Sequence, residues 1–582
     1  MRSDPVIVLK LGGSVLSGED ALPRAVHEVY RWRREGYGVV AVVSALAGET
    51  NALLARTGGD GEPPPPHALA ALAALGEQRA AALLGLHLER AGVSARVLSP
   101  ATLRLVAQGD PLDALPVGLD PRPLRRALAD GAVAVVPGFF AHDADGHIVL
   151  LGRGGSDLSA LFLAARLQAR CRLVKDVDGL YARDPALPGP PPARYAAATW
   201  DDALATDGSI VQHKALIVAQ SAGRPFEIAG LGNARETLVG APLAHLEAVP
   251  APAAPLRVAL LGLGTVGGGV LVALRRLPEC FEVVAACARD RARPRPGLPS
   301  DLPLHDDAVA TASCGADVVV ECLGGLVPAR SALGAALRSG AHVVTTNKAV
   351  LAAHGAELER LAAANGVSLR ASAAAGGAMP LLPALRRLAR TERIAGLEAV
   401  LNGTTTCVLD QLARGASPEE ALEHARRLGL CERKVQRDLS GRDAADKLVL
   451  ACHAATGRWI DPRTVTCVPI GPAELARARA GAVLRQVATL RLDGARPLAD
   501  VRPVVLDPAH PLARTRGAGN AALLRTDAGR LLLEGRGAGR WPTVEAVVAD
   551  LLDLARDPPR RRPRACRFGH HHAAVILARD AL

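Results

Sequence analysis

Aromatic residues, paired cysteines and long apolar runs are scarce in this chain of 582 residues. Aromatics make up only 2% of it, so a net charge of +11 comes without the side chains that would stack nucleic-acid bases. Ten cysteines stand singly, which gives no sign of a disulfide framework or a structural zinc site. No segment reaches about 18 uninterrupted apolar residues. We therefore expect a cytoplasmic protein with no membrane span and no nucleic-acid partner.

Lysine is also rare. Only six of the 69 basic residues are lysine. They are Lys10, Lys175, Lys214, Lys348, Lys434 and Lys447. Arginine keeps its proton under ordinary conditions, whereas the pKa of a lysine can be shifted until it gives up a proton. The lysines that remain in this arginine-rich chain are therefore candidates for chemistry that arginine cannot perform.

The chain divides at a Pro/Ala stretch, VPAPAAP, at 249–255. Its length exceeds what one hydrophobic core supports. Two places combine a buried strand with a glycine-rich turn, namely VIVLKLGG at 6–13 and LRVALLGLGTVGGGV at 256–270. These features predict an α/β fold in two halves, at 1–246 and 256–556.

The glycine-rich turn of the C-terminal half has the spacing of a dinucleotide-binding fingerprint. Gly262, Gly264 and Gly267 follow a strand-like segment and open an amphipathic helix, which lets a backbone turn approach a pyrophosphate closely. The next strand ends near Arg289, where the residue that reads the ribose is expected. An arginine there favours a 2′-phosphate and hence NADP, unless Arg289 is only a solvated loop charge.

Two lysines of the C-terminal half stand in catalytic locations. Lys348 follows the strand AHVVTT and so lies at the carboxyl edge of a sheet, where open α/β sheets bind ligands. Lys447 lies four residues after Asp443 on a predicted helix, so the two share a face. A surface salt bridge is the alternative, but arginine would serve it equally well, and we favour the catalytic role.

The C-terminal half resembles homoserine dehydrogenase. The similarity spans 256–556 and rests on GLGTVGGGV, ECLGG, VVTTNKAV, AAAGGAMP, VLNGTTTCVL, GLCERKVQRDLSGRDAADK and GRGAGRWPTVEAVVADLL. The resemblance implies NADP- or NAD-dependent interconversion of aspartate β-semialdehyde and homoserine. It further implies a Rossmann domain with an inserted substrate and dimerisation domain, and at least a homodimer or homotetramer.

The resemblance assigns roles to individual residues of this half. It implies that Lys348 and Lys447 stand at the substrate carbonyl, with Asp443 orienting Lys447, because an ammonium can stabilise and protonate the developing oxyanion. The cofactor would lie on Gly262, Gly264, Thr265, Val266, Gly267, Arg289, Thr346, Lys348 and Gly537. The substrate would be held by Glu432, Asp438, Asn402, Gly403 and Thr404.

The family's monovalent-cation site, for Na⁺ or K⁺, would fall on the glycine loop at 372–379. Its ligands would be Ser372, Ala375, Gly377 and Met379, mainly through backbone carbonyls. Ser372 stands where the family usually has Glu, which weakens the case for a cation. Other departures are Arg433-Lys434-Val435 for the usual Pro-Asp-Pro and Thr406-Cys407 for the usual Asn-Tyr. None of them removes a proposed proton-transfer residue, although Lys434 is left without a role.

The N-terminal half carries signs of phosphoryl transfer without a Walker loop. Lys10 stands where the first strand meets Gly12 and Gly13, a place where backbone N–H groups and an ammonium can hold phosphates. RGGSD at 153–157 begins a helix whose N-terminus can hold an anion. LVKDVDGLYARDP at 173–185 ends a strand in carboxylates that suit Mg²⁺ bound to ATP, or that merely form a solvated turn.

These segments, with VVSALAGETN and GEQR, resemble the amino acid kinase family and aspartokinase in particular. The resemblance covers 5–245 and implies phosphorylation of the aspartate β-carboxylate by ATP and Mg²⁺. Lys10 and Asp157 would be catalytic. Nucleotide would lie on Gly12, Gly13, Ser14, Asp176, Tyr181, Arg183 and Lys214. Aspartate would be held by Ser44, Thr50, Glu77, Arg153 and Ser156.

The N-terminal half also departs from the kinase pattern. LGGSV replaces the usual F-G-G-T-S, Lys175 replaces a usual Thr, and Gln212-His213 replaces a usual His-Pro. A catalytically inactive kinase-like domain therefore remains an alternative to an active one. Only about ten residues separate the two resemblances, which leaves no room for the regulatory ACT domains of the family. We accordingly expect no inhibition by threonine or lysine.

Together the two resemblances imply a domain order. It reads 1–246 kinase domain, 247–255 linker, 256–380 cofactor domain, 381–535 substrate and dimerisation domain, 536–556 segment returning to the cofactor domain, and 557–582 basic tail. That tail contains three consecutive histidines, which could bind a metal, although a polar tail is the favoured interpretation.

Overall fold

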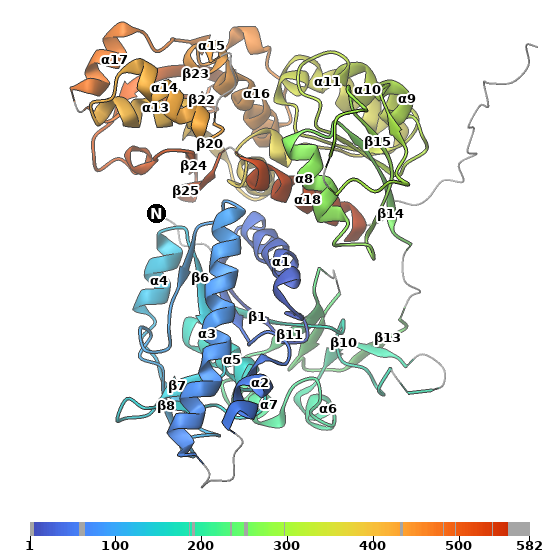
Figure 1. The fold of residues 1–582 in the computed structure, drawn as a ribbon, viewed down its shortest axis with the longest axis vertical. Coiled ribbons are helices and arrows are strands. Elements are labelled where there is room, and N and C mark those ends of the chain that lie inside the picture. The colour runs from blue at the N-terminus through green and yellow to red at the C-terminus, as the bar shows by residue number, and fades with distance from the viewer. Residues whose placement is uncertain are drawn as a thin grey trace, which may run out of the picture. The chain divides into compact units, whose positions relative to one another are not determined.

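The computed structural model of the chain (Figure 1) forms two compact units. The first unit joins residues 1–253 to residues 371–556, and the second unit is built on residues 254–370. The described residues are 5–57, 64–185, 187–188, 192–232, 235–249, 254–295, 297–430, 435–480, 482–494, 496–537 and 539–556.

The N-terminal part of the first unit is built on a nine-stranded sheet of order β13-β10-β12-β11-β9-β1-β2-β6-β3. Its central strands are parallel and almost entirely buried, which fits their content of Val, Ile, Leu and Ala. The strands are β1 (Val6–Leu11), β2 (Gly38–Val43), β3 (Ala95–Val97), β6 (Val133–Pro137), β9 (Arg170–Lys175), β10 (Arg194–Ala198), β11 (Phe226–Gly230), β12 (Thr237–Val239) and β13 (His245–Glu247).

Two hydrophobic clusters cover the two faces of this sheet. Ile7, Leu9 and Leu11 of β1 pack with α1 (Leu22–Arg34) and α3 (Pro66–Arg90). Val8 packs on the opposite side, with α4 (Arg122–Ala129), α5 (Gly155–Leu167) and α7 (His213–Ser221). Because side chains alternate along a strand, Lys10 lies on the face of Val8, toward α5.

A smaller four-stranded sheet, of order β5-β4-β7-β8, lies in the same part of the chain. It comprises β4 (Val106–Gln108), β5 (Leu115–Gly118), β7 (Phe140–His142) and β8 (Ile148–Leu150), and β7 and β8 form an antiparallel hairpin. The hairpin packs against α3, the long blue helix of Figure 1. In the described chain, α3 alone is long and apolar enough to cross a membrane, yet half of its most apolar window is buried inside the protein.

The second unit is a parallel sheet of order β16-β15-β14-β17-β18-β19, which is the doubly wound order with a reversal between its first and fourth strands. The strands are β14 (Leu256–Leu261), β15 (Phe281–Cys287), β16 (Leu304–His305), β17 (Val318–Glu321), β18 (His342–Thr345) and β19 (Leu369–Arg370). The helices are α8 (Thr265–Leu274), α9 (Ala308–Ala312), α10 (Ala329–Arg338) and α11 (Lys348–Asn365).

Residues 371–556 form a fourth, mainly antiparallel sheet of order β21-β23-β22-β20-β24-β25. Its strands are β20 (Ile394–Val400), β21 (Thr466–Cys467), β22 (Leu484–Arg491), β23 (Leu498–Val505), β24 (Gly519–Thr526) and β25 (Gly529–Arg536). Helices α13 (Gly403–Ala413) and α16 (Arg442–Thr456) contact β22. Helix α18 (Arg540–Arg556) contacts the 3-10 turn Ser372–Ala374.

The kinase-like part and residues 371–556 share buried contacts within the first unit. Helix α1 packs against α18, and Ala549 belongs to the same hydrophobic cluster as α1 and α3. His27 Nδ1 lies 2.6 Å from Glu545 Oε1, and Arg34 Nη2 lies 2.7 Å from Asp550 Oδ1. Residues 254–370, with their parallel sheet, therefore form a unit of their own, while the N-terminal part and residues 371–556 pack together within the first unit.

Candidate functional sites

The first candidate site is a pocket of about 270 Å³ at the carboxyl ends of β1 and β9. Five of the predicted kinase residues line it, brought together from three separate segments. Its lining is Lys10, Ser44, Phe139, Arg153, Gly154, Gly155, Ser156, Asp157, Lys175, Ser209, Ile210 and Gln212. Phe139, Ser209, Ile210 and Gln212 come from loops, and no sequence motif pointed to them.

A buried carboxylate is shared by two lysines in this pocket. Lys10 Nζ lies 2.9 Å from Asp157 Oδ1, and Lys175 Nζ lies 2.6 Å from Asp157 Oδ2. Burial alone would raise the pKa of Asp157, but the two ammonium groups outweigh it and hold that pKa below its ordinary value. Burial and the charge of Lys10 lower the pKa of Lys175. The trio carries a net charge of +1, which suits an anion.

The N-terminus of α5 opens into the same pocket. Gly154 caps the helix with a φ of +74°, a left-handed conformation that glycine adopts without strain. The first N–H groups of a helix have no intrahelical partner and carry its positive dipole end. Together with Lys10 and Lys175, this end of α5 can hold a phosphate or a carboxylate.

Glu77 extends the site from the middle of α3. Its side chain is buried, and Oε1 accepts a hydrogen bond of 3.1 Å from the backbone N–H of Ala45, which follows the pocket residue Ser44. Burial raises the pKa of Glu77 from 4.5 to about 7. The carboxyl group therefore changes its protonation state near neutral pH.

The residues predicted for nucleotide divide into two groups. Ser14 Oγ donates to Asp176 Oδ1 at 3.0 Å, and the Tyr181 hydroxyl donates to Asp178 Oδ1. These carboxylates follow β9 directly, and their oxygens are ligands of the kind that Mg²⁺ prefers, so the residues present fit Mg²⁺. Burial and Asp178 raise the pKa of Tyr181 to about 12, so the phenol stays protonated.

Two other residues predicted to bind nucleotide form hydrogen bonds with protein groups instead. Lys214 Nζ donates to the carbonyls of Ala114 and Leu151, at 3.1 and 3.2 Å, and forms an ion pair with Asp113. Arg183 is exposed and donates to the Pro188 carbonyl at 3.5 Å. Lys214 thus fastens α7 to the loop that precedes Arg153. The equivalence between Lys214 and a nucleotide ligand stays a prediction.

The glycine turn of the second unit leaves room where the fingerprint requires it. Gly262, with a φ of +94°, follows β14, and a Cβ on it would lie 2.7 Å from the Cys322 carbonyl oxygen. A Cβ on Gly267 would lie 1.8 Å from the Gly262 carbonyl oxygen. A Cβ on Gly264 would meet no atom within 4 Å. The space above Gly264 at the start of α8 fits a pyrophosphate, so the residues present fit NADP or NAD.

Thr265 and Val266 open α8 beside this turn, and Arg289 is an exposed residue just beyond β15. The position after β15 is where a ribose-reading residue belongs in the doubly wound order. Gly537 belongs to the first unit, where its N–H donates to the Ala518 carbonyl at 2.9 Å. Its contact with a cofactor therefore stays a prediction.

A buried carboxylate that sequence reasoning left without a role organises the edge that carries Lys348. Glu321, fully buried at the end of β17, accepts a hydrogen bond of 2.5 Å from Thr345 Oγ1 and one of 2.8 Å from the Leu323 N–H. Asn347 caps α11, so Lys348 is the first residue of that helix. Thr346 N–H donates to the Glu321 carbonyl at 3.1 Å. The sequence ECLGG could have indicated a role for Glu321, because a carboxylate buried at the end of an apolar strand needs hydrogen-bond partners.

The predicted dehydrogenase residues of the first unit form one hydrogen-bonded cluster. Lys447 is buried, and its Nζ donates to the Leu401 carbonyl at 2.5 Å and to Asp443 Oδ2 at 2.8 Å. Asn402 Nδ2 donates to Asp443 Oδ2 at 2.8 Å and to Asp438 Oδ1 at 2.7 Å. The i and i+4 spacing on α16 and the N-cap position of Asn402 on α13 bring these groups together.

The remaining residues singled out in this half either form other contacts or lie outside the described residues. Gly403 begins α13, and a Cβ on it would lie 3.3 Å from Ala518. Thr404 Oγ1 donates to the Leu430 carbonyl at 2.7 Å. Glu432 and Lys434 lie outside the described residues. Lys348 and Lys447 belong to different units, so their meeting at one carbonyl oxygen stays a prediction.

The loop predicted for a monovalent cation is held by other contacts. Ser372 Oγ donates to Asp550 Oδ1 at 2.7 Å and accepts from Arg34 Nη2 at 3.1 Å. The Met379 carbonyl accepts from the Leu381 N–H at 2.8 Å. Arg34 is itself paired with Asp550 and Asp553, so the hydroxyl of Ser372 is engaged by a balanced ion-pair network, and a cation at this loop stays a prediction. Ala375 and Gly377 lie in the same buried loop.

Models of known protein families match three successive parts of the chain. Residues 5–230 match the amino acid kinase family, residues 262–371 match the NAD-binding domain of homoserine dehydrogenase, and residues 380–552 match homoserine dehydrogenase. These family matches include no ACT domain.

Individual relatives match the C-terminal half. Homoserine dehydrogenase of Synechocystis sp. is 34% identical over 316 residues, which cover 51% of this chain and 73% of that protein. Homoserine dehydrogenase of Corynebacterium glutamicum is 34% identical over 325 residues, covering 53% and 73%. The crystal structure of a homoserine dehydrogenase from Thiobacillus denitrificans shares 34% identity and covers 53% of this chain and 76% of that one, with a TM-score of 0.49.

Proposed function

The chain belongs to the homoserine dehydrogenase family and carries an amino acid kinase domain, and from this premise we propose that it has two activities. The C-terminal half interconverts aspartate β-semialdehyde and homoserine with NADP or NAD. The N-terminal half phosphorylates the β-carboxylate of aspartate with ATP and Mg²⁺. The buried Lys447–Asp443–Asn402 cluster carries the first proposal, and the Lys10–Asp157–Lys175 trio carries the second.

In the dehydrogenase reaction, Gly262, Gly264 and Gly267 would hold a nicotinamide cofactor, which would supply the hydride for reduction or accept it in oxidation. Lys447 donates a proton to the aldehyde oxygen during reduction and takes it back during oxidation. Asp443 accepts a hydrogen bond from Lys447 and fixes the direction of its ammonium, while Asn402 holds Asp443 in place. We propose that Lys348 brings a second positive charge to the same oxygen and that Glu432 and Asp438 hold the substrate.

In the kinase reaction, the protein contributes position and charge rather than a covalent intermediate. Lys10 and the N-terminus of α5 stabilise the negative charge on the transferred phosphoryl group. Arg153 and Ser156, which line the same pocket, hold the aspartate carboxylates. Asp176 and Asp178 are the residues that would hold Mg²⁺ on the nucleotide.

Lys175 supports a second candidate for the N-terminal half. Its ammonium lies 2.6 Å from Asp157, a carboxylate that the kinase prediction needs at the site. If that pair stays closed, the domain binds ATP and aspartate without transferring phosphate. This candidate leaves the dehydrogenase activity unchanged.

Two assays on the purified full chain separate these proposals. Reduction of NADP or NAD with homoserine tests the dehydrogenase, and its absence with both cofactors contradicts that proposal. Formation of aspartyl hydroxamate from ATP, Mg²⁺ and aspartate tests the kinase. Product that falls at least a hundredfold in Lys10→Met supports an active kinase. No product from the wild type supports the inactive domain.

We also propose that the protein works in the cytoplasm as a homodimer or homotetramer and lacks inhibition by threonine or lysine. We propose as well that the domain boundaries predicted from the sequence hold. Light scattering of the purified chain gives the oligomeric state. Addition of millimolar threonine to the homoserine assay tests regulation, and inhibition by it contradicts the absence of a regulatory domain.

A further inference from the structure

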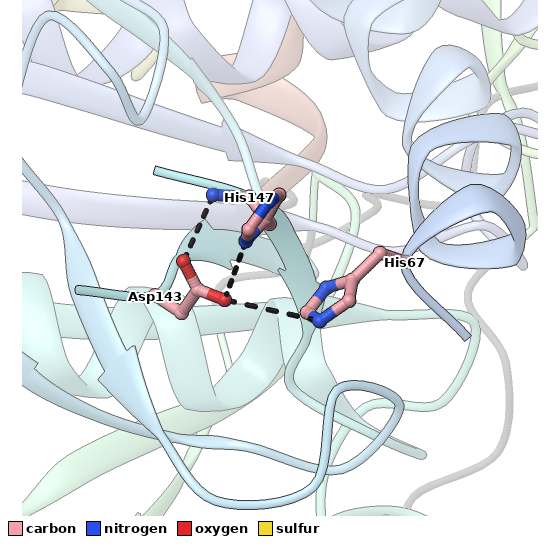
Figure 2. Close-up of side chains that lie close together, drawn as sticks. All are labelled: His67, Asp143 and His147. Carbon is pink, nitrogen blue, oxygen red and sulfur yellow. Dashed lines mark hydrogen bonds and ion pairs between the residues drawn. The ribbon is translucent and has the colours of Figure 1, made fainter. Parts of the chain in front are cut away.

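Three side chains with metal-binding chemistry converge outside both candidate sites (Figure 2). His67 is the second residue of α3, and Asp143 and His147 flank the turn of the β7–β8 hairpin. One ligand atom from each residue lies within 4.8 Å of the other two. Figure 2 shows the two imidazole rings facing the same carboxylate from different elements.

The two oxygens of Asp143 have separate partners. Oδ1 accepts the backbone N–H of Asp145 at 3.0 Å and that of His147 at 2.8 Å, which fixes the orientation of the carboxylate. Oδ2 lies 3.3 Å from His147 Nδ1 and 3.9 Å from His67 Nε2. Oδ2 therefore faces both imidazole rings.

The ring of His67 is oriented by the hairpin itself. His67 Nδ1 lies 3.3 Å from the Ile148 carbonyl oxygen and donates to it when protonated there. In that tautomer Nε2 carries the lone pair, and it points toward Asp143. A backbone carbonyl that receives the second ring N–H is the usual outer partner of a metal-binding histidine. The centroids of the two rings lie 4.7 Å apart, and one ligand atom from each ring lies within 4.8 Å of the other.

We propose that His67, Asp143 and His147 bind a divalent first-row transition-metal ion of the zinc class. For metal–nitrogen bonds of about 2.0 Å in a tetrahedron, ligand atoms lie about 3.3 Å apart, close to the 3.3 and 3.9 Å found here. Two imidazoles favour Zn²⁺, Co²⁺ or Ni²⁺ over Mg²⁺, which prefers oxygen ligands. Water completes the coordination, because the side chain of His147 is 58% exposed.

The ion would join two elements that frame the kinase pocket. Helix α3 carries Glu77, and β8 leads directly into Gly152 and the pocket residue Arg153. An ion bound by both His67 and the hairpin would therefore restrict the movement of α3 relative to the strand that leads into the pocket. The proposal does not depend on the kinase being active, because the metal ligands come from outside the pocket lining.

Zinc titration of the full chain tests this site. The background protein should carry Gln at His570, His571 and His572, which excludes metal uptake by that run of histidines. Zn²⁺ is titrated calorimetrically into this protein at pH 7.5, where imidazole is available as a ligand, with millimolar Mg²⁺ present. His67→Gln and His147→Gln are compared with His245→Gln, a control histidine exposed on β13.

We expect one equivalent of Zn²⁺ to bind and to raise the thermal unfolding midpoint of the background and the His245→Gln protein. Each of His67→Gln and His147→Gln should weaken binding at least tenfold and remove the midpoint shift. Their midpoints without metal must match the background, which shows that folding is intact. Equal binding by all four proteins, or no binding at millimolar Zn²⁺, would show that the cluster only forms hydrogen bonds.

Discussion

The two candidate sites of the first unit both combine lysine with aspartate, but in opposite proportions. In the kinase pocket one carboxylate, Asp157, is shared by two ammonium groups. In the dehydrogenase cluster one ammonium, Lys447, stands with Asp443 and Asp438, which a single amide joins. The pocket is therefore left with positive charge and the cluster with negative charge.

This difference matches the chemistry proposed for each site. A phosphoryl donor and an aspartate carboxylate are anions, and a surplus of positive charge stabilises their approach. An aldehyde is neutral, and negative charge develops on its oxygen only as the hydride arrives, so its reduction requires an oriented proton donor more than a standing surplus of positive charge. We therefore propose two purposes for the scarce lysines, charge neutralisation by Lys10 and Lys175 and proton transfer by Lys447.

The largest effect should come from removing the shared carboxylate. Asp157→Asn leaves the ammonium groups of Lys10 and Lys175 facing one another in a buried place. We expect a loss of about 3 kcal/mol in unfolding free energy and at least a hundredfold loss of aspartyl hydroxamate formation. Urea unfolding and the hydroxamate assay measure the two effects, and the homoserine assay is the internal control.

The pH dependence of that loss has a defined sign. The folded-state pKa of Asp157 is depressed, so its stabilising contribution is complete above the unfolded value of about 3.9 and disappears as the pH falls through the lower folded value. Wild type and Asp157→Asn should therefore differ in stability at pH 7 and converge toward pH 2. A difference that stays constant over that range would contradict the ion pairs.

Glu77 should give the reverse dependence. Its pKa rises from 4.5 to about 7 in the folded protein, so the folded state binds the proton more tightly than the unfolded state. Stability then falls as the pH rises from 4.5 to 7, by about 3 kcal/mol for a shift of this size. Glu77→Gln cannot ionise, and its stability relative to wild type should increase over this range. Parallel urea midpoints at pH 5 and pH 8 would show that Glu77 is not held in its neutral form.

The glycine turn allows a matched pair of substitutions. Gly264→Ala places a methyl group where the protein leaves open space, so it should fold normally but weaken NADP binding at least tenfold by blocking the pyrophosphate. Gly268→Ala, whose Cβ would come no closer than 4.0 Å to the Leu263 carbonyl oxygen, is the control. Cofactor fluorescence titration measures both. Equal affinities would place the pyrophosphate elsewhere.

The smallest effect is expected at Arg289. If its guanidinium binds the 2′-phosphate, Arg289→Ser should weaken NADP about tenfold and leave NAD unchanged, because a charged hydrogen bond contributes about 1.5 kcal/mol or more. The ratio of kcat/KM for the two cofactors in homoserine oxidation is the measurement. An unchanged ratio would leave Arg289 as a solvated loop residue.

Much of the fold followed from local sequence patterns. The strand and glycine-turn motifs predicted both α/β sheets, and the alternation along β1 explains why Lys10 faces Asp157 while Ile7, Leu9 and Leu11 do not. Spacing alone paired Asp443 with Lys447 on α16. These features are local, so the backbone period decides which side chains share a face.

Local sequence patterns could not predict the contacts between segments that are distant in the sequence. Nothing in the sequence joined Lys175 to Asp157, placed Phe139 and Gln212 in the pocket, or brought His67 to the β7–β8 hairpin. Lys214 met Asp113 through the packing of α7, and Ser372 met Arg34 through the packing of α1 near α18. Such pairs depend on how separate elements pack, which local periodicity does not encode.

Homoserine oxidation by Lys447→Arg is the most direct test of the account, because arginine keeps the positive charge and loses only proton transfer and fit. We predict that kcat falls at least a hundredfold, with KM for homoserine changing less, while aspartyl hydroxamate formation is unaffected. Lys348→Arg, measured alongside with NAD and NADP, should also lower kcat, and Lys434→Arg should behave as wild type. Full activity of Lys447→Arg would contradict proton transfer by this lysine.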